Sequence, residues 1–123
     1  MARVLLVDDD PDGLEIRKIL LERDGHQVSI AADVATARDL FRETAPDCVI
    51  LDLRLPSPED GLALVREFRE SREFREAAPG LRIVVLAGWG ADLEGRPEQE
   101  LVDEVLAKPV RSERLAHAVR KRA

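Results

Sequence analysis

The sequence is poor in the residues that build several common kinds of site. Its 123 residues include one cysteine, no tyrosine, one tryptophan and two histidines. The single cysteine, Cys48, has no partner for a disulfide, and its place at the start of an apolar run predicts a buried side chain in a reducing compartment. His26 and His117 have no companion at metal-ligand spacing, so neither predicts a metal site.

Basic charge and long apolar runs are scarce as well. The chain has 19 Lys and Arg against 25 Asp and Glu, a formal net charge of -6. This balance argues against a nucleic-acid-binding surface, which would need a basic patch. No apolar run approaches the roughly 20 residues that cross a bilayer, and the N-terminus lacks the long apolar segment of a signal peptide. We therefore predict a cytoplasmic protein with no direct contact to nucleic acid or membrane.

The length and composition are those of one globular domain. Of the 123 residues, 45% are hydrophobic and 36% are charged, which is enough apolar side chain for one buried core. We expect a single domain over residues 1–123, without an output domain.

Short apolar runs alternate with amphipathic segments along the chain. The runs predict strands, and the segments between them have the hydrophobic spacing of helices. The predicted strands are Arg3–Val7, Gln27–Ala31, Val49–Leu53, Ile83–Ala87 and Glu104–Ala107. The predicted helices are Pro11–Arg23, Val34–Thr44, Leu62–Ala77, Glu98–Asp103 and one that begins near Ser112. This (βα)5 pattern predicts an α/β fold, a doubly wound parallel five-stranded sheet with helices on both faces.

The side chains of two predicted helices can be assigned to faces. In the first helix, which starts after an expected N-cap at Asp10, Ile16, Ile19 and Leu20 are expected to face the sheet. The segment Leu55–Gly61 before the third helix is expected to be a loop. The outer face of the third helix is expected to be solvated, with ion pairs of small individual worth. It carries Arg66, Arg69, Arg72 and Arg75.

Acidic side chains and one lysine stand where predicted strands end. Asp8 and Asp9 follow the first strand, Asp52 lies within the apolar run 48–56, and Lys108 follows the fifth strand. Doubly wound sheets bind ligands at the carboxyl ends of their strands, so we expect these residues in one pocket. Three carboxylates repel one another, and a divalent cation with oxygen ligands relieves that repulsion. Mg²⁺ fits best.

The same pocket suits phosphoryl transfer. A carboxylate can act as a nucleophile toward phosphorus, so Asp52 is predicted to accept a phosphoryl group, and Lys108 to hold a phosphoryl oxygen. The acidic residues and the lysine also have simpler alternative roles. Asp8 and Asp9 are alternatively capping or solvated residues of a strand-to-helix turn, and Lys108 is alternatively a surface lysine.

Five motifs, in their order and spacing, resemble the receiver domains of two-component response regulators. They are V-L-L-V-D-D-D-P, V-I-L-D-L-R-L-P, D-G-L-A-L-V-R, V-V-L-A-G-W-G and L-A-K-P-V, and they extend over essentially the whole chain. The resemblance implies a flavodoxin-like sheet in the strand order 2-1-3-4-5. It also implies phosphorylation of Asp52 by a histidine kinase or a phosphotransfer protein.

The resemblance further implies roles for individual residues. Mg²⁺ would be held by Asp8 or Asp9, by Asp52 and by the backbone carbonyl of Arg54, with Lys108 on the phosphoryl group and a cis bond before the proline that follows it. Receivers are not conventional enzymes, although they catalyse their own phosphorylation from small donors and their own slow dephosphorylation. Their output is altered binding of a downstream protein through the last strand and its flanking helices, where receivers often also dimerise.

Two positions depart from the family pattern. Ala87 stands where the family has Thr or Ser, so no hydroxyl reaches the phosphoryl oxygen, and such a hydrogen bond to a charged group is worth roughly 1.5 to 3 kcal/mol. Val105 stands where the family often has an aromatic residue or His that rotates inward. We therefore predict that phosphorylation survives while its conformational read-out is weak or uses other residues.

Two other functions compete with a switching receiver. One is a receiver-fold interaction module that no longer switches, which Ala87 and Val105 favour. The other is a metal-dependent phosphatase of the haloacid dehalogenase type, because Asp8 and Asp10 form an Asp-x-Asp pair. That family needs a longer chain with a further Ser or Thr motif, so we disfavour it.

Overall fold

The fold is a five-stranded parallel sheet, known from a computed structural model that describes residues 2–53, 57–88, 93 and 95–120. Arg54, the predicted carbonyl ligand, lies outside these residues. The strands are β1 (Arg3–Val7), β2 (Gln27–Ala31), β3 (Cys48–Asp52), β4 (Arg82–Ala87) and β5 (Glu104–Ala107). They pair in parallel in the order β2-β1-β3-β4-β5. This confirms the predicted fold class and strand order.

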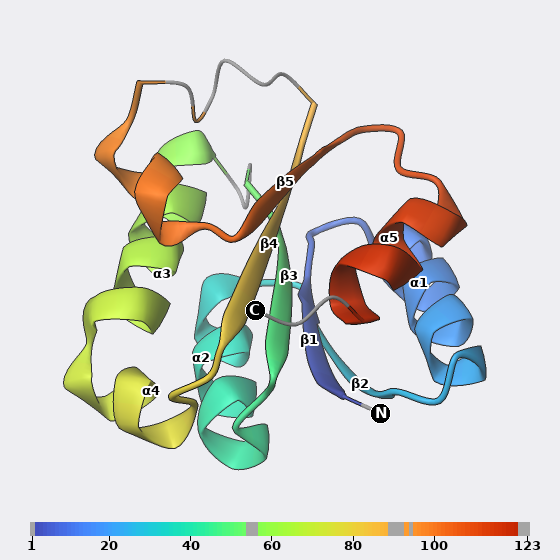
Figure 1. Ribbon diagram of the computed structural model, residues 1–123, viewed down its shortest axis with the longest axis horizontal. Helices are drawn as coiled ribbons and strands as arrows, with labels where there is room; N and C mark the ends of the chain where they lie inside the picture. The colour runs from blue at the N-terminus through green and yellow to red at the C-terminus, as the bar shows by residue number, and fades with distance from the viewer. Residues whose placement is uncertain (1, 54–56, 89–92, 94, 121–123) are drawn as a thin grey trace.

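Helices cover both faces of the sheet (Figure 1). On one face lie α1 (Pro11–Arg23) and α5 (Ser112–Arg120), and on the other lie α2 (Val34–Thr44), α3 (Pro58–Glu70) and α4 (Arg72–Ala77). Alternate residues of the central strands enter the two cores, which explains their unbroken apolar runs. No helix among the described residues has the length and apolar character needed to span a bilayer.

The thiol of Cys48 is buried at the start of β3 with 2% of the residue exposed. Burial in this apolar surrounding raises the pKa of Cys48 to about 12. The thiol is therefore protonated and unreactive at neutral pH, as expected for a structural cysteine.

Three phenylalanines join the helices on the α2 side of the sheet. The ring centroids of Phe41 and Phe68 are 4.5 Å apart, and Phe74 packs edge-on to them at 4.8 and 5.1 Å. Phe68 and Phe74 are six residues apart, so in one straight helix they would point about 120° away from each other. The break at Ser71, with φ -66° and ψ 131°, allows both rings to reach Phe41. The single predicted helix Leu62–Ala77 is therefore two helices.

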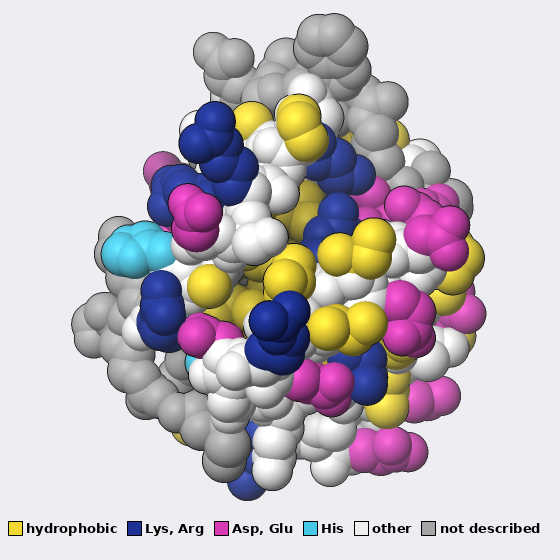
Figure 2. Space-filling view, turned by 90° about the vertical axis from the view of Figure 1, so that its right-hand side faces the viewer, with side chains coloured by type: hydrophobic (Ala, Val, Ile, Leu, Met, Phe, Trp, Pro, Cys, Tyr) yellow, Lys and Arg dark blue, Asp and Glu magenta, His cyan; other side chains and the backbone are white. Residues whose placement is uncertain are grey.

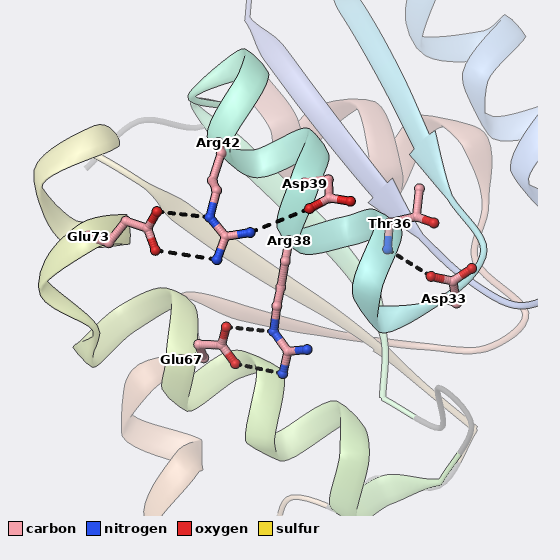
Figure 3. Close-up of polar contacts among 7 residues, drawn as sticks. All are labelled: Asp33, Thr36, Arg38, Asp39, Arg42, Glu67 and Glu73. Atoms are coloured by element: carbon pink, nitrogen blue, oxygen red, sulfur yellow. Dashed lines mark hydrogen bonds and ion pairs between the residues drawn. The ribbon is translucent and has the colours of Figure 1, made fainter.

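Bidentate ion pairs reinforce this packing (Figure 3). Arg38 of α2 donates to both carboxylate oxygens of Glu67 at 2.6 and 2.8 Å, and Arg42 donates to those of Glu73 at 2.8 and 3.4 Å. At the start of α2, the Asp33 carboxylate accepts from the amide of Thr36 at 2.7 Å. This hydrogen bond lowers the pKa of Asp33.

The helix after β3 begins earlier than predicted. Ser57 is its N-cap, with the hydroxyl accepting from the amide of Asp60 at 3.3 Å, and Pro58 occupies the first turn. A capping serine followed by proline is a helix start, so the expected loop through Gly61 was wrong for the described part of that segment.

The outer face of α3 was expected to be solvated, with ion pairs of small individual worth, and Arg69 departs from this because it also binds backbone carbonyls. Arg69 donates to the carbonyls of Leu101 and Leu81 at 3.0 and 2.9 Å and pairs with Asp103 at 2.8 Å. Arg66 pairs with the buried carboxylate of Glu98. These contacts fasten the crossover between β4 and β5 onto α3.

That crossover contains a shorter helix than the sequence predicts. Its described part holds the 3-10 helix η2 (Pro97–Leu101) instead of a helix over Glu98–Asp103. Val102 is already extended, with φ -102° and ψ 134°. Asp103 then pairs with Ile83 in both directions, its amide donating at 2.8 Å and its carboxylate accepting at 2.6 Å. These bonds draw the residues before β5 into the sheet.

The inward face of α1 differs from the expectation. Leu14 and Leu21 are buried, whereas Ile16 is 60% exposed and Ile19 51% exposed. The face that carries α1 and α5 accordingly shows hydrophobic side chains among charged ones (Figure 2). Arg17 turns inward on the same side of α1 as Leu14, because it pairs with a buried carboxylate.

Because Leu14 is buried and Ile16 is exposed, mutations at these two positions of α1 should differ in their effect on stability. We expect Leu14→Ala to lower the free energy of unfolding by about 2 to 4 kcal/mol because it opens a cavity in the core. Ile16→Ala, a change at an exposed helical site, should stay within about 0.5 kcal/mol. Urea unfolding of the two variants compares them directly, and equal losses would contradict the observed orientation of α1.

Candidate functional site

Asp52 ends β3 and is held by Lys108. The residue is 5% exposed, and the side chain of Lys108 donates from Nζ to Oδ2 of Asp52 at 2.6 Å. Lys108 follows β5, and its amide donates to the carbonyl of Ala87 at 2.9 Å. The peptide bond between Lys108 and Pro109 is cis, as the resemblance implies. The sheet therefore brings together two residues that are 56 positions apart in the chain.

Asp8 lies at the end of β1 with 3% of the residue exposed. One carboxylate oxygen accepts from the amide of Asp10 at 3.0 Å, and the other accepts from Nη1 of Arg17 at 2.8 Å. Burial raises the pKa of Asp8, helped by the nearby charge of Asp52, and the bonds from Asp10 and Arg17 only partly oppose this. Burial therefore disfavours the ionised form of Asp8, and the hydrogen bonds from Asp10 and Arg17 compensate for only part of this cost.

Three carboxylates converge at this edge of the sheet. Asp8, Asp9 and Asp52 each offer an oxygen within 4.8 Å of the others, and Asp9 is the exposed member. Convergent carboxylates that leave room for water are the ligand set Mg²⁺ prefers. The residues present therefore fit a divalent cation, which the two buried carboxylates and Asp9 would hold.

The carboxylates and two cationic side chains line one hollow of about 580 Å³. Its lining residues are Asp8, Asp9, Asp10, Arg17, Asp52, Lys108, Pro109 and Val110. Asp10 is the N-cap of α1 by position, as expected, but its side chain makes no capping hydrogen bond. The pocket opens at the carboxyl ends of the strands, which is where doubly wound sheets place ligands.

The two positions that depart from the family lie on β4 and β5. Ala87 is the last residue of β4, pairs with Ala107 and is 2% exposed. Val105 is 40% exposed on β5, which is an edge strand of the sheet. Ala87 is thus a buried methyl group at the end of the strand next to β3, and Val105 is a small, exposed apolar side chain.

Arg17 is the basic residue of the pocket that the sequence pattern did not predict. The inward face predicted for α1 carries Ile16, Ile19 and Leu20, and it places Arg17 away from the sheet. The spacing Leu14, Arg17, Leu21 is also a helical face, and it begins one turn after the acidic residues. This spacing is the pattern in the sequence that indicates an inward position for Arg17.

The raised pKa of Asp8 predicts how stability depends on pH. The folded protein binds the Asp8 proton more tightly than the unfolded chain does, so stability is lost as pH rises from the ordinary value of 3.8 through the raised value. Asp8→Asn removes this loss. We therefore expect the free energy of unfolding of the variant, relative to the parent protein, to be greater at pH 7 than at pH 3.

Urea unfolding at the two pH values with a chelator present measures this difference. Asp33→Asn is the control with the opposite sign, because hydrogen bonds lower the pKa of Asp33 and its ionised form supports folding. An Asp8→Asn effect that is independent of pH, or larger at pH 3, would contradict the assignment.

Comparisons with known proteins agree with this geometry. The family model for the response regulator receiver domain matches residues 4–120. The chain is 38% identical over 94 residues to the virulence transcriptional regulatory protein PhoP of Salmonella typhimurium, an alignment that covers 76% of this chain and 40% of PhoP. It is 39% identical over 88 residues to the photosynthetic apparatus regulatory protein RegA of Rhodobacter capsulatus, which covers 72% of this chain and 44% of RegA. The chain thus spans less than half the length of these curated relatives.

Solved structures show the same fold. A response regulator receiver domain protein from Clostridium thermocellum superposes with a TM-score of 0.80 at 30% identity, over 97% of this chain and 91% of that one. The response regulator TrrA from Thermotoga maritima, in complex with Mg(2+)-BeF, superposes with a TM-score of 0.78 at 26% identity, over 97% and 96% of the two chains.

Proposed function

Because the chain belongs to the response regulator receiver domain family, we propose that it is a cytoplasmic receiver of a two-component system in which Asp52 accepts a phosphoryl group. The donor is a histidine kinase or a phosphotransfer protein. One observation carries this proposal: Nζ of Lys108 lies 2.6 Å from a carboxylate oxygen of the buried Asp52, in the same pocket as the carboxylates of Asp8 and Asp9. The proposed nucleophile Asp52, the ammonium group of Lys108 and the proposed cation ligands thus line one pocket.

The proposed reaction transfers the phosphoryl group from a donor atom to a carboxylate oxygen of Asp52. The oxygen attacks phosphorus, the bond from phosphorus to the donor nitrogen or oxygen breaks, and the donor keeps the electron pair. Lys108 moves from the carboxylate to a phosphoryl oxygen, which places its charge where negative charge accumulates. Bound Mg²⁺ supplies neutralisation of the remaining phosphoryl charge.

Signalling by this receiver is proposed to be weak or to use residues other than the family's usual pair. Ala87 has no hydroxyl group that could donate a hydrogen bond to a phosphoryl oxygen. The crossover after β4 is also fastened to α3, by Arg69 to Asp103 at 2.8 Å and by Arg96 to Glu59 at 2.9 Å. This fastening favours the second candidate function, an interaction module that does not switch.

The partner surface is proposed to include the edge of the sheet at β5 and the helices beside it. β5 is the outermost strand on that side, and an edge strand offers unpaired backbone groups to another chain. Val105 adds an exposed apolar side chain there. A downstream protein is the proposed partner, and a second copy of the chain is the alternative. That residues 1–123 form a single receiver domain stays a prediction.

Incubation with Mg²⁺ and acetyl phosphate, followed by intact mass measurement, tests the proposed function. We expect one phosphoryl adduct, absent from Asp52→Asn and from a sample with chelator. No adduct on a folded protein that binds Mg²⁺ would favour the interaction module. An adduct that persists in Asp52→Asn would assign the phosphorylation to another residue.

Amide NMR signals of the phosphorylated protein distinguish a weak conformational read-out from a change that extends along the strands. We expect changes confined to the pocket, with little change along β4 and β5. A large shift throughout both strands would contradict the weak read-out.

A further inference from the structure

The pocket contains two cationic side chains, and each holds one of the two buried carboxylates. Lys108 pairs with Asp52, and Arg17 of α1 pairs with Asp8 at 2.8 Å. The side chains of Arg17 and Asp8 are 21% and 5% exposed, so water screens this pair only partly. The two buried carboxylates of the pocket are therefore each paired with a cationic side chain, whereas the four carboxylates that line it outnumber its two cations.

The position of Arg17 bears on where a cation would bind. Both oxygens of Asp8 are engaged, one by the amide of Asp10 and the other by the Arg17 guanidinium. The oxygen that Asp8 offers to the carboxylate cluster lies within 4.8 Å of those of Asp9 and Asp52. A cation among these oxygens lies close to the guanidinium, and like charges at such separations repel strongly in a partly buried site.

We propose that Arg17 competes with the divalent cation for Asp8 and thereby sets the affinity of the pocket for Mg²⁺. Without the cation, Arg17 neutralises Asp8. The cation binds as the guanidinium moves away from that carboxylate, because Asp8 then exchanges one positive partner for another. This inference rests on the proposed Mg²⁺ site and adds a residue that the metal-binding motif does not contain.

The competing explanation gives Arg17 a structural role alone. A buried carboxylate needs a partner, and Arg17 would then support Asp8 in the geometry that binds the cation. The two explanations predict opposite effects of removing the charge. Competition predicts tighter Mg²⁺ binding in its absence, and structural support predicts weaker binding.

Calorimetric titration with Mg²⁺ at fixed ionic strength separates them. We expect Arg17→Gln to lower the Kd for Mg²⁺ on the order of tenfold, within the usual range of coupling between neighbouring sites. Arg17→Lys, which keeps the charge, should stay close to the parent protein. Arg23→Gln is the matched control, because Arg23 is an exposed arginine of the same helix and is not among the residues that line this pocket.

A second measurement needs no variant. In the parent protein, the NMR signal of the Arg17 guanidinium should shift as Mg²⁺ saturates the pocket. An unchanged signal, or equal or weaker Mg²⁺ binding by folded Arg17→Gln, would overturn the competition. Failure of the parent protein to bind Mg²⁺ at all would instead overturn the proposed metal site, so the two failures are distinguishable.

Discussion

Gly61→Ala is expected to lower the free energy of unfolding by at least about 3 kcal/mol, the upper part of the range for overpacked cores. Gly61 is buried in the first turns of α3, and a Cβ atom there would lie 1.8 Å from the carbonyl oxygen of Leu53. Leu53 has little freedom to retreat. It is fully buried, and its amide donates to the carbonyl of Leu86 at 3.1 Å.

The same substitution should disturb the site, because Leu53 directly follows Asp52. We expect any Gly61→Ala protein that remains folded to be phosphorylated more slowly than the parent protein. Gly80→Ala is the control, since a Cβ at Gly80 meets no atom within 4 Å, and it should change stability by less than about 0.5 kcal/mol. Equal urea midpoints for the two variants would refute the close approach of α3 to the end of β3.

Lys108→Met is expected to slow the phosphorylation of Asp52 by acetyl phosphate about 100-fold, the loss typical of removing one group that stabilises charge in a transition state. Methionine keeps most of the length of the side chain and removes the ammonium. In the metal-free protein the change also leaves the carboxylate of Asp52, with 8% of its side chain exposed, without the partner at 2.6 Å. We expect lower stability at neutral pH that added Mg²⁺ partly restores.

Lys18→Met is the control for this experiment. Lys18 lies on α1 and pairs with Glu22 at 3.1 Å, outside the residues that line the pocket. The rate of adduct formation, followed by intact mass over time, should be unchanged in Lys18→Met. A Lys108→Met protein that is phosphorylated at the parental rate would remove Lys108 from the proposed reaction.

The strands and the pocket were predictable because they depend on local patterns and one general rule. Strands buried on both faces are continuous apolar runs, and polar residues mark their ends, as Asp8 does after β1. The rule that ligands bind at the carboxyl ends then places Asp52 and Lys108 together without any distance information.

The orientation of α1 was not predictable in the same way. Ile16 and Ile19 have helical spacing, but so do Leu14 and Leu21, and periodicity alone does not choose between the two faces. The choice follows from a tertiary contact, the 2.8 Å pair between Arg17 and Asp8. The pair between Arg17 and Asp8 therefore explains both the unexpected inward face of α1 and the unexpected place of Arg17 in the pocket.

The break between α3 and α4 has a similar origin. Ser71 is neither proline nor glycine, and although it is the N-cap of α4 its side chain makes no capping hydrogen bond, so the local signal for a break is weak. The break is required by contacts of Phe68 and Phe74 with Phe41 on α2, which is distant in the sequence. Arg69 of α3, which was expected to be solvated, likewise donates to the carbonyl of Leu101, a residue that follows β4.

The position of the phosphoryl group is the most direct test of the proposed function. Borohydride reduction converts a phosphorylated aspartate to homoserine, and peptide mass spectrometry then identifies the modified residue. After treatment with Mg²⁺ and acetyl phosphate, we expect homoserine at position 52 and unmodified Asp8 and Asp9. Homoserine at either of those two positions, with Asp52 unchanged, would contradict the assignment of Asp52 as the phosphoacceptor.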